Sequence, residues 1–489
     1  MNIKNLERNT MHTLTLSLCA LSMTAGAMAS TVLYEDQELI ASDEAQYGGF
    51  GSEVSLSGET LLVCAAGNDS FGIDAGICWV FRRCWNGVFA EQQVLFSSDG
   101  GWFERFGYSA AVSDDLMVIG SRAKVVDGQV DAGAAYVFED MDGEWVETGI
   151  ITAPMPQQGS LFSWSLDTDG DSIIIGARMA DGETGAAWVY VRDDVGQWVV
   201  QATLMGDIID AGDQFGFSAA IEGDRAVVGA PYVNTCGTTN RCGGVFVFER
   251  DGETWTQSDL ITPDDLASED YFGWDCDLDE DGDRIVGTSI YNDDNGSQSG
   301  CGYVWDLADG NWVQAAKLLP SDGQTQDQCG KQCEIQGNTV VISSWYGNDD
   351  KGEAWAWQLN GDEWTELAML RASNGGVTDI FGRSATLDGD TVVVGADWHD
   401  LGPDDDNAGA AYVYDLAMAS LPQGACCTNG SCVSATLGDC QAFGGTYQGN
   451  GTDCGDYDCG DDCAADVDGN GEVGVDDLLE VIAGWGMCP

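Results

Sequence analysis

The chain has few basic residues and very few histidines for its length. Its 489 residues include 18 Lys and Arg against 82 Asp and Glu, and only two histidines. A net charge of −64 argues against nucleic acid or an anionic lipid surface as a partner. His12 lies in an apolar N-terminal segment, so His399 alone remains for the folded protein, and a His-rich zinc site is excluded.

Long hydrophobic runs are also missing beyond the N-terminus. No apolar run approaches the roughly 18 residues that a transmembrane helix needs. The first 29 residues carry Lys4 and Arg8, then an apolar stretch over 14–23, then the small residues of Ala27-Met28-Ala29. This pattern is typical of a secretory signal peptide. We therefore expect residues 1–29 to be removed and the mature protein to be secreted, without membrane insertion.

Catalytic motifs are equally scarce. No GxSxG elbow accompanies His399, and no P-loop occurs. The sequence therefore predicts no catalytic residue and a protein that is not an enzyme. Glycoside cleavage needs only two carboxyl groups, however, and these are abundant. A secreted glycosidase or polysaccharide lyase remains an alternative.

The strongest feature present is a unit of 52 to 57 residues that recurs seven times. We call the first residue of each copy its anchor. The anchors and the residues that follow them are Phe50-Gly51, Phe106-Gly107, Phe162-Ser163, Phe215-Gly216, Phe272-Gly273, Cys329-Gly330 and Phe381-Gly382. A turn-forming acid or amide stands nine residues after six of the anchors. Such regularity indicates an array of like structural units.

Each copy is predicted to form four short antiparallel strands with alternating apolar residues. Tight turns such as Gly223-Asp224 separate them. Four-stranded units repeated radially form a β-propeller, so we predict an all-β, seven-bladed and monomeric propeller over residues 30–420. The seventh copy ends after Tyr414 without a fourth strand, and Leu33–Leu39 has the spacing of that strand. We expect this N-terminal strand to complete blade seven and close the ring.

The Phe-Gly anchors, the Gly-Asp turns and strand ends such as Val394-Gly395-Ala396 resemble FG-GAP repeats, the units of integrin α-chain propellers. The resemblance implies the propeller fold, and it says little about the ligand. Integrin-type blades often carry a DxDxDG calcium loop. Asp167–Asp171 has a similar pattern but the standard repeat length, which favours a plain hairpin turn. Asp279, Asp281 and Asp283 lie in a turn with two extra residues, so we keep them as calcium candidates.

Long acidic loops are expected to gather on one face of the disc, because strands two and three of every blade meet there. Aromatic residues stand among these loops, and variable loops on a rigid scaffold commonly carry recognition. The candidates for a ligand face are Trp345, Tyr346, Trp398, Tyr232 and Tyr291. They favour an extracellular glycan or protein ligand, and the alternative is a set of solvated loops.

Cysteine usage agrees with an oxidising compartment. Cys236 and Cys242 bracket a loop of the fourth copy, while Cys64 and Cys78 lie on neighbouring strands of the first, so each pair is a disulfide candidate. Four more cysteines in the fifth and sixth copies allow three pairings, which stay open: Cys276, Cys301, Cys329 and Cys333. Cys84 is left over, and we expect one free thiol.

The composition changes over residues 421–460, where cysteines gather among Gly, Thr and Asp. The cysteines are Cys426, Cys427, Cys432, Cys440, Cys454 and Cys459. So short a segment buries little apolar surface and should depend on disulfides. We interpret it as a disulfide-rich spacer, with a binding module as the alternative.

A calcium loop is predicted in the tail, residues 461–489. Asp466, Asp468, Asn470 and Asp477 hold ligand positions 1, 3, 5 and 12, and Glu472 would offer its backbone carbonyl. With Asp as the twelfth ligand, the pattern resembles one dockerin type I repeat. Dockerins usually have two such repeats, so the resemblance favours an attachment or sorting tag over cohesin binding.

Cys463 and Cys488 bracket this loop and are expected to pair. The sequence as a whole predicts a secreted binding or adhesion propeller whose C-terminus binds calcium and attaches it to a cell surface. A structural cell-surface component is the remaining alternative.

Overall fold

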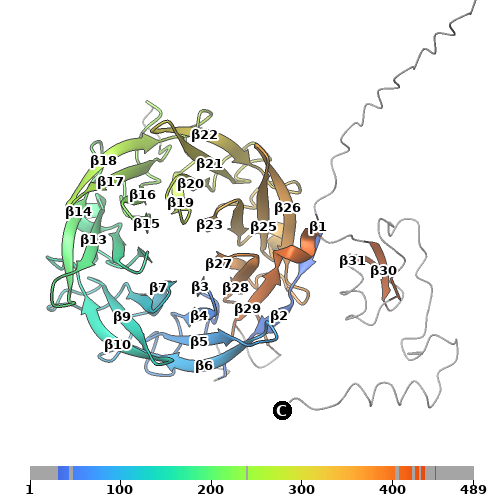
Figure 1. Cartoon of the computed structure of the whole chain (residues 1–489), viewed down its shortest axis with the longest axis horizontal. Helices are drawn as coiled ribbons and strands as arrows, with labels where there is room; N and C mark the ends of the chain where they lie inside the picture. Colours follow the sequence, from blue (N-terminus) through green and yellow to red (C-terminus); the bar gives the residue numbers. More distant parts are fainter. Residues whose placement is uncertain are drawn as a thin grey trace, which may run out of the picture.

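The computed structural model describes residues 31–42, 48–237, 241–401, 407–420, 424–428, 431–435 and 446–447. Residues 31–420 form seven sheets arranged radially about a central axis, which confirms the predicted seven-bladed propeller (Figure 1). In blades one to five the strands are antiparallel and run in sequence order from the axis outwards, whereas the N-terminal segment supplies the outermost strands of blades six and seven. No described helix is long and apolar enough to cross a membrane.

The strands of the first three blades are β3 Glu53–Ser57, β4 Thr60–Ala65, β5 Ile77–Arg83 and β6 Phe89–Leu95; β7 Phe106–Ser113, β8 Leu116–Ser121, β9 Ala134–Met141 and β10 Glu144–Ile151; and β11 Ser165–Thr168, β12 Ser172–Ala177, β13 Ala186–Arg192 and β14 Trp198–Leu204. Those of blades four and five are β15 Ser218–Glu222, β16 Arg225–Gly229, β17 Val245–Asp251 and β18 Thr254–Ile261; and β19 Phe272–Leu278, β20 Arg284–Ser289, β21 Cys301–Ala308 and β22 Asn311–Leu318.

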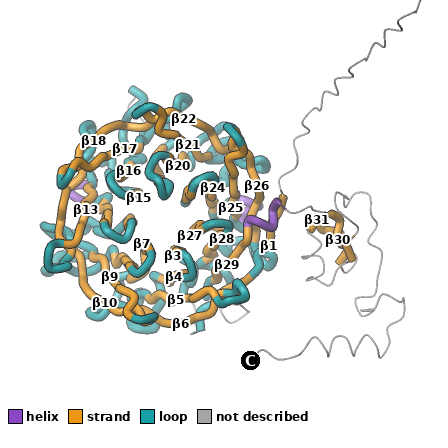
Figure 2. Tube along the Cα trace, in the orientation of Figure 1, coloured by secondary structure: helices purple, strands orange, loops and turns teal. Residues whose placement is uncertain are grey.

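Blade six contains β23 Cys333–Gln336, β24 Thr339–Ser344, β25 Glu353–Asn360 and β26 Glu363–Arg371, and blade seven contains β27 Phe381–Asp388, β28 Thr391–Ala396 and β29 Ala410–Asp415. Two single-turn helices, α1 Ala180–Glu183 and α2 Gly347–Asp350, lie in loops, and the 3-10 helix η1 Leu416–Ser420 follows β29. The remaining secondary structure of the ring is strand and turn (Figure 2).

The second strand of each blade is the most apolar, because neighbouring blades cover both of its faces. Every residue of β4, β8 and β12 is buried. The outer strand β10 instead alternates: Trp145 and Ile151 are buried, whereas Glu144, Val146, Thr148 and Ile150 are exposed. The buried clusters span blade boundaries: Val189 and Leu204 of blade three pack with Val228 and Phe246 of blade four. No blade buries its own core, so the blades stabilise one another.

The anchor of the fourth blade, Phe215, shows how the start of each repeat packs between strands. Phe215 is fully buried, and its ring meets Phe246 of the third strand edge-on at 5.4 Å between centroids. Gly185, which precedes the third strand of the previous blade, lies against the Phe215 backbone. Its φ is +83°, and a Cβ there would lie 1.9 Å from the Phe215 carbonyl oxygen. Only glycine fits at this position.

Side chains of the inner strands link each blade to the next. The fifth residue after the anchor accepts a hydrogen bond from a backbone N–H of the following blade, at 2.8–3.1 Å, at five of the seven boundaries. These acceptors and donors are Ser55 with Val112, Asp167 with Ile221, Asp277 with Ile335, Glu334 with Leu387, and Thr386 with Leu56. These side chains satisfy donors on inner edges that no strand pairs.

The N-terminal segment closes the ring, but it splits between two blades. β2 Gln37–Leu39 pairs antiparallel with β29 and is the fourth strand of blade seven, as predicted. β1 Thr31–Tyr34 pairs in parallel with β26 and adds a fifth strand to blade six, so the assignment of Leu33 to blade seven is wrong. Leu33 is buried with Leu370, whereas Leu39 is buried with Phe50 and Trp79. The segment therefore spans the blade six–seven boundary.

Both loop disulfides are confirmed: Cys64–Cys78 and Cys236–Cys242. Cys84 is an exposed free thiol, as predicted, but the expectation of a single free thiol is wrong. Four buried cysteines are also unpaired: Cys276, Cys301, Cys329 and Cys333.

The repeat geometry explains why Cys276 and Cys333 do not pair. Cys276 Sγ points towards blade four, 3.2 Å from Ser218 Oγ. Cys333 holds the same position in the next blade, so rotation about the axis relates the two thiols and they do not face each other. Both instead pack as small apolar side chains in different buried clusters.

Part of the Cys-rich segment is described. β30 Gly424–Thr428 pairs with β31 Ser431–Ala435 and with β32 Thr446–Tyr447 in a small antiparallel sheet, and Cys427 is in a disulfide. The calcium loop over Asp466–Asp477 and the pair Cys463 and Cys488 lie outside the described residues, and both stay predictions.

Candidate functional site

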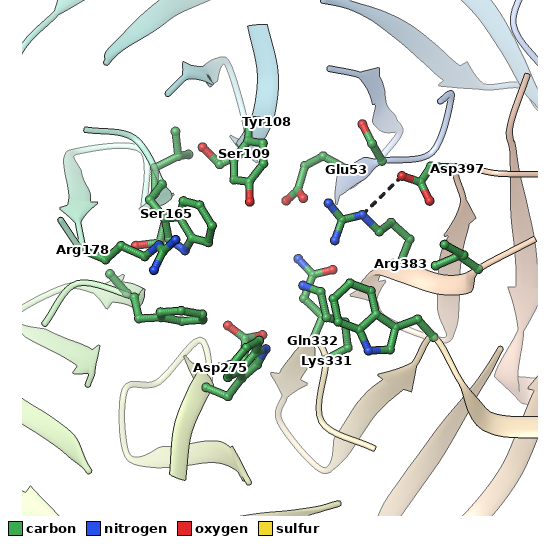
Figure 3. Close-up of a pocket in the computed structure, with 18 of the residues that line it drawn as sticks. Glu53, Tyr108, Ser109, Ser165, Arg178, Asp275, Lys331, Gln332, Arg383 and Asp397 are labelled. Atoms are coloured by element: carbon green, nitrogen blue, oxygen red, sulfur yellow. Dashed lines mark ion pairs between the residues drawn. The ribbon is translucent and has the colours of Figure 1, made fainter. Parts of the chain in front are cut away.

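A cavity of about 560 Å³ opens at the centre of the ring. Its walls are the first residues of the inner strands and the residues that follow the second strands. It therefore lies on the face that carries the long loops, as the sequence predicted for ligand recognition. Side chains from different blades converge on it (Figure 3).

One position of the repeat supplies a residue from every blade. The second residue after each anchor lines the cavity in all seven copies: Ser52, Tyr108, Trp164, Phe217, Trp274, Lys331 and Arg383. Blades two to five thus contribute four aromatic rings in succession, which we call the aromatic arc. Blades six and seven contribute two cations. The cavity therefore has an aromatic side and a side that carries two cations.

The rings of the aromatic arc contact one another. The centroids of Tyr108 and Trp164 are 5.1 Å apart, those of Trp164 and Phe217 are 5.7 Å apart, and those of Phe217 and Trp274 are 4.6 Å apart. The Arg178 guanidinium lies 3.8 Å from the Trp164 centroid and fixes that ring through a cation–π contact. A continuous, pre-ordered aromatic surface of this kind suits a flat ligand ring.

The two cations differ in their partners. Arg383 pairs with Asp397 at 3.3 Å, and Asp397 raises the pKa of Arg383 although burial opposes it. Lys331 has no ion pair within 4 Å among the described residues, and its ammonium lies 5.2 Å from the Trp345 ring centroid. Burial lowers the pKa of Lys331 to about 8, so it still carries its charge at pH 7.

Two carboxyl groups share the cavity with these cations. Burial raises the pKa of Glu53 to about 8, so that this side chain is mainly neutral at pH 7. Burial raises the pKa of Asp275 less, to about 6, because Asp275 accepts a hydrogen bond from the Cys333 backbone at 2.8 Å. The neutral Glu53 leaves the Lys331 charge only partly compensated.

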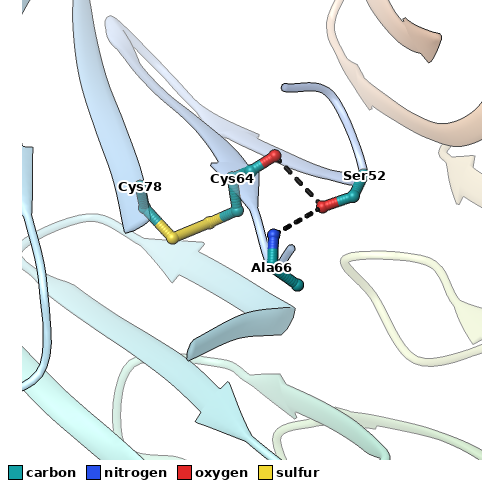
Figure 4. Close-up of a disulfide and its surroundings, with 4 residues drawn as sticks. All are labelled: Ser52, Cys64, Ala66 and Cys78. Carbon is teal, nitrogen blue, oxygen red and sulfur yellow. Dashed lines mark hydrogen bonds between the residues drawn. A yellow bond between two sulfur atoms is a disulfide. The ribbon is translucent and has the colours of Figure 1, made fainter. Parts of the chain in front are cut away.

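The Cys64–Cys78 disulfide supports the blade-one side of the cavity. The Ser52 hydroxyl donates to the Cys64 carbonyl at 3.2 Å and accepts from the Ala66 N–H at 3.1 Å (Figure 4). Since the disulfide joins β4 to β5 beside this contact, it fixes the strand end on which Ser52 rests.

The predicted ligand-face residues are only partly brought together. Tyr232, Trp345 and Trp398 line the cavity. Tyr346 packs against Trp345, and Tyr291 packs against Trp274, and neither reaches the cavity wall. Sequence reasoning missed the aromatic arc and both cations, although comparing the second residue after each anchor would have found them.

The predicted calcium turn of blade five is held by its own backbone. Asp279 Oδ1 accepts hydrogen bonds from the N–H groups of Asp283 and Arg284, at 3.1 and 3.0 Å. Among the described residues, no group of three or more His, Cys, Asp or Glu side chains is placed to hold a metal ion. Calcium at Asp279, Asp281 and Asp283 stays a prediction. Asp169 likewise accepts from Ser172 within its hairpin turn, as expected for the third blade.

Comparison with known proteins gives one family. A family model described as FG-GAP repeat matches residues 34–81, 89–138, 145–190, 198–248, 255–305, 312–356 and 364–414. Each match after the first begins at the outer strand of one blade or its turn and ends on the third strand of the next. The solved structures that resemble the chain include a crystal structure of a protein from Lactobacillus plantarum, at 16% identity and a TM-score of 0.45, over 66% of this chain and 86% of the other. No curated protein matches the chain.

Proposed function

Because the chain belongs to the FG-GAP repeat family, we propose that it is an extracellular, non-catalytic binding protein that takes a glycan into the axial cavity of its propeller. The aromatic arc carries this proposal. Sugar rings present C–H faces that pack on aromatic rings, and the serine, glutamine and carboxyl groups beside the arc can bond to hydroxyls. A protein ligand is the alternative.

Two features of the chain support the extracellular part of the proposal. Residues 1–29 have the features of a signal peptide, and two disulfides staple loops of the propeller. The tail around Asp466–Asp477 would bind calcium and attach the protein to a cell surface. Calcium is the cofactor we propose for this tail.

The test is an oligosaccharide array followed by titration calorimetry of the strongest ligand. Trp274→Ala removes one ring of the aromatic arc and should weaken binding about tenfold, as expected for the loss of one stacking contact. Trp85→Ala is the matched control, because Trp85 is 99% exposed in the turn between β5 and β6, on the opposite face. A folded wild type that binds no array glycan, or equal losses in both variants, would refute the proposal.

A polysaccharide-degrading enzyme is the second candidate function. Glu53 and Asp275 favour it, since both are carboxyl groups with raised pKa values in the cavity. The same glycans should then be cleaved on prolonged incubation, and Glu53→Gln should abolish the cleavage. Unchanged glycan chains after incubation would favour the binding protein.

A further inference from the structure

We propose that the glycan taken into the axial cavity is acidic: a saccharide whose ring stacks on the aromatic arc and whose carboxylate or sulfate binds to Lys331 and Arg383. This inference rests on the proposed function of the cavity as a glycan site. It names the class of ligand, which the fold alone does not.

The first observation is where the cations are. The chain is strongly acidic, and most Lys and Arg side chains of the propeller pair with a carboxylate. Lys331 and Arg178 line the cavity, and neither has an ion pair with a described residue. Arg122 is also unpaired, and it lies 4.1 Å from the ring centroid of Tyr108 in the arc. Among the described residues, these three cations without an ion pair all lie in the cavity wall or against the aromatic arc.

The second observation is the order of residues around the ring. Cations and aromatic rings occupy the same position of the repeat but in different blades, so they face one cavity from different directions. Figure 3 shows Lys331 and Arg383 across the cavity from Tyr108 and Arg178. A sugar ring on the arc would therefore direct a substituent at the cations, and a neutral sugar would leave Lys331 without an ion pair.

Desolvation gives the physical reason for selectivity. The Lys331 ammonium is half-buried in the cavity wall, and no described carboxylate lies within 4 Å to replace the water that it has lost. An anionic group of the ligand beside Lys331 would offset the free-energy cost of desolvating its ammonium, whereas a hydroxyl would offset it poorly. Arg383 can donate a hydrogen bond to the ligand while it keeps its ion pair with Asp397.

The experiment compares matched ligands on the full-length protein. The probes are an oligogalacturonate, the same oligosaccharide after reduction of its carboxyl groups, and a sulfated galactan oligosaccharide with its desulfated form. Titration calorimetry should show binding of at least one charged probe, and removal of its charge should weaken binding about tenfold or more. Comparison of the galacturonate pair with the galactan pair shows whether the bound anion is a carboxylate or a sulfate.

Lys331→Gln removes the unpaired cation opposite the aromatic arc and should abolish most of this discrimination, while neutral probes keep their affinity. Lys351→Gln is the control, with the same charge change in the same blade at a residue outside the cavity. Thermal unfolding confirms that each variant is folded.

Each outcome decides between the two proposals. Equal binding of charged and neutral forms would overturn the acidic class and leave the glycan site intact. If no saccharide binds to the folded wild type, both proposals fall. Cleavage of a charged probe would support the acidic class and overturn the non-catalytic assignment.

Discussion

Glu334→Gln should stabilise the propeller at alkaline pH and leave it unchanged in acid. Glu334 lies on the inner strand β23, and its Oε2 accepts a hydrogen bond from Leu387 N–H of the next blade at 2.8 Å. Gln332 and Gln336, two residues to either side, make equivalent bonds to blade seven through their amide oxygens. A glutamine therefore fits this position and keeps the bond, and the substitution removes only the ionisation.

The magnitude follows from the pKa of Glu334. Burial raises it from 4.5 to about 8, and repulsion from Asp167 adds to the rise. Because the folded pKa exceeds the unfolded one, the native state is favoured fully below pH 4.5, and this stability is lost as pH rises to about 8. The full shift is worth about 4.8 kcal/mol. Because Glu334 is only half-buried, solvent screening reduces that value, and we expect about 1–3 kcal/mol.

Thermal unfolding of wild type and variant at about pH 4.5 and about pH 9 tests this expectation. For a ring of this size, 1 kcal/mol shifts Tm by roughly 1 °C, so the variant should gain about 1–4 °C at the higher pH only. Glu363→Gln, at an exposed outer-strand residue, should change neither value. A Tm difference that is independent of pH, or a variant less stable at both, would refute the reasoning.

Three further predictions follow from the ring and the tail. Leu39→Asp places a carboxylate in the buried contact that closes the ring, so Tm should fall steeply and limited proteolysis should release the N-terminal segment. Gly185→Ala should cost about 2 kcal/mol or more in denaturant unfolding, because its Cβ would meet the Phe215 carbonyl. Gly196→Ala, with a similar φ in open space, should cost less. Asp468→Ala should reduce the calcium stoichiometry of the full chain by one in titration calorimetry, and an unchanged stoichiometry would remove the tail site.

The sequence predicted the blades because their interior repeats. A buried anchor, a tight turn and a β-branched second strand recur at constant spacing, and each is required by packing against neighbouring blades. Ring closure could be predicted for the same reason, since blade seven lacked one strand. The pairing of β1 with blade six could not, because Thr31–Tyr34 carries no repeat signal and adds to an outer edge that any short strand can extend.

The site was predicted less completely, for a physical reason. Trp345 and Trp398 stand out in the sequence because they lie in long loops, whereas Trp164 and Trp274 lie within the repeat and look like core residues. Only the closed ring shows that they face the axis. The four buried thiols were misjudged in the same way, because proximity in sequence says nothing about the direction of a side chain around the ring.

The residues that build the ring and those that build the cavity are two positions apart at the start of each blade, and they have different structural requirements. The anchor must fill a fixed space between strands. The residue two positions later faces the open axis, so each blade can carry a different side chain there without disturbing the core.

Stability and selectivity should therefore separate in experiments. Lys331→Gln should alter which glycan binds while Tm stays near the wild-type value, whereas Leu39→Asp should lower Tm and abolish all binding together, because an opened ring no longer brings the seven positions into one cavity. If Leu39→Asp unfolded the ring but kept its glycan affinity, the binding site would belong to a single blade, and the axial cavity would not be the site.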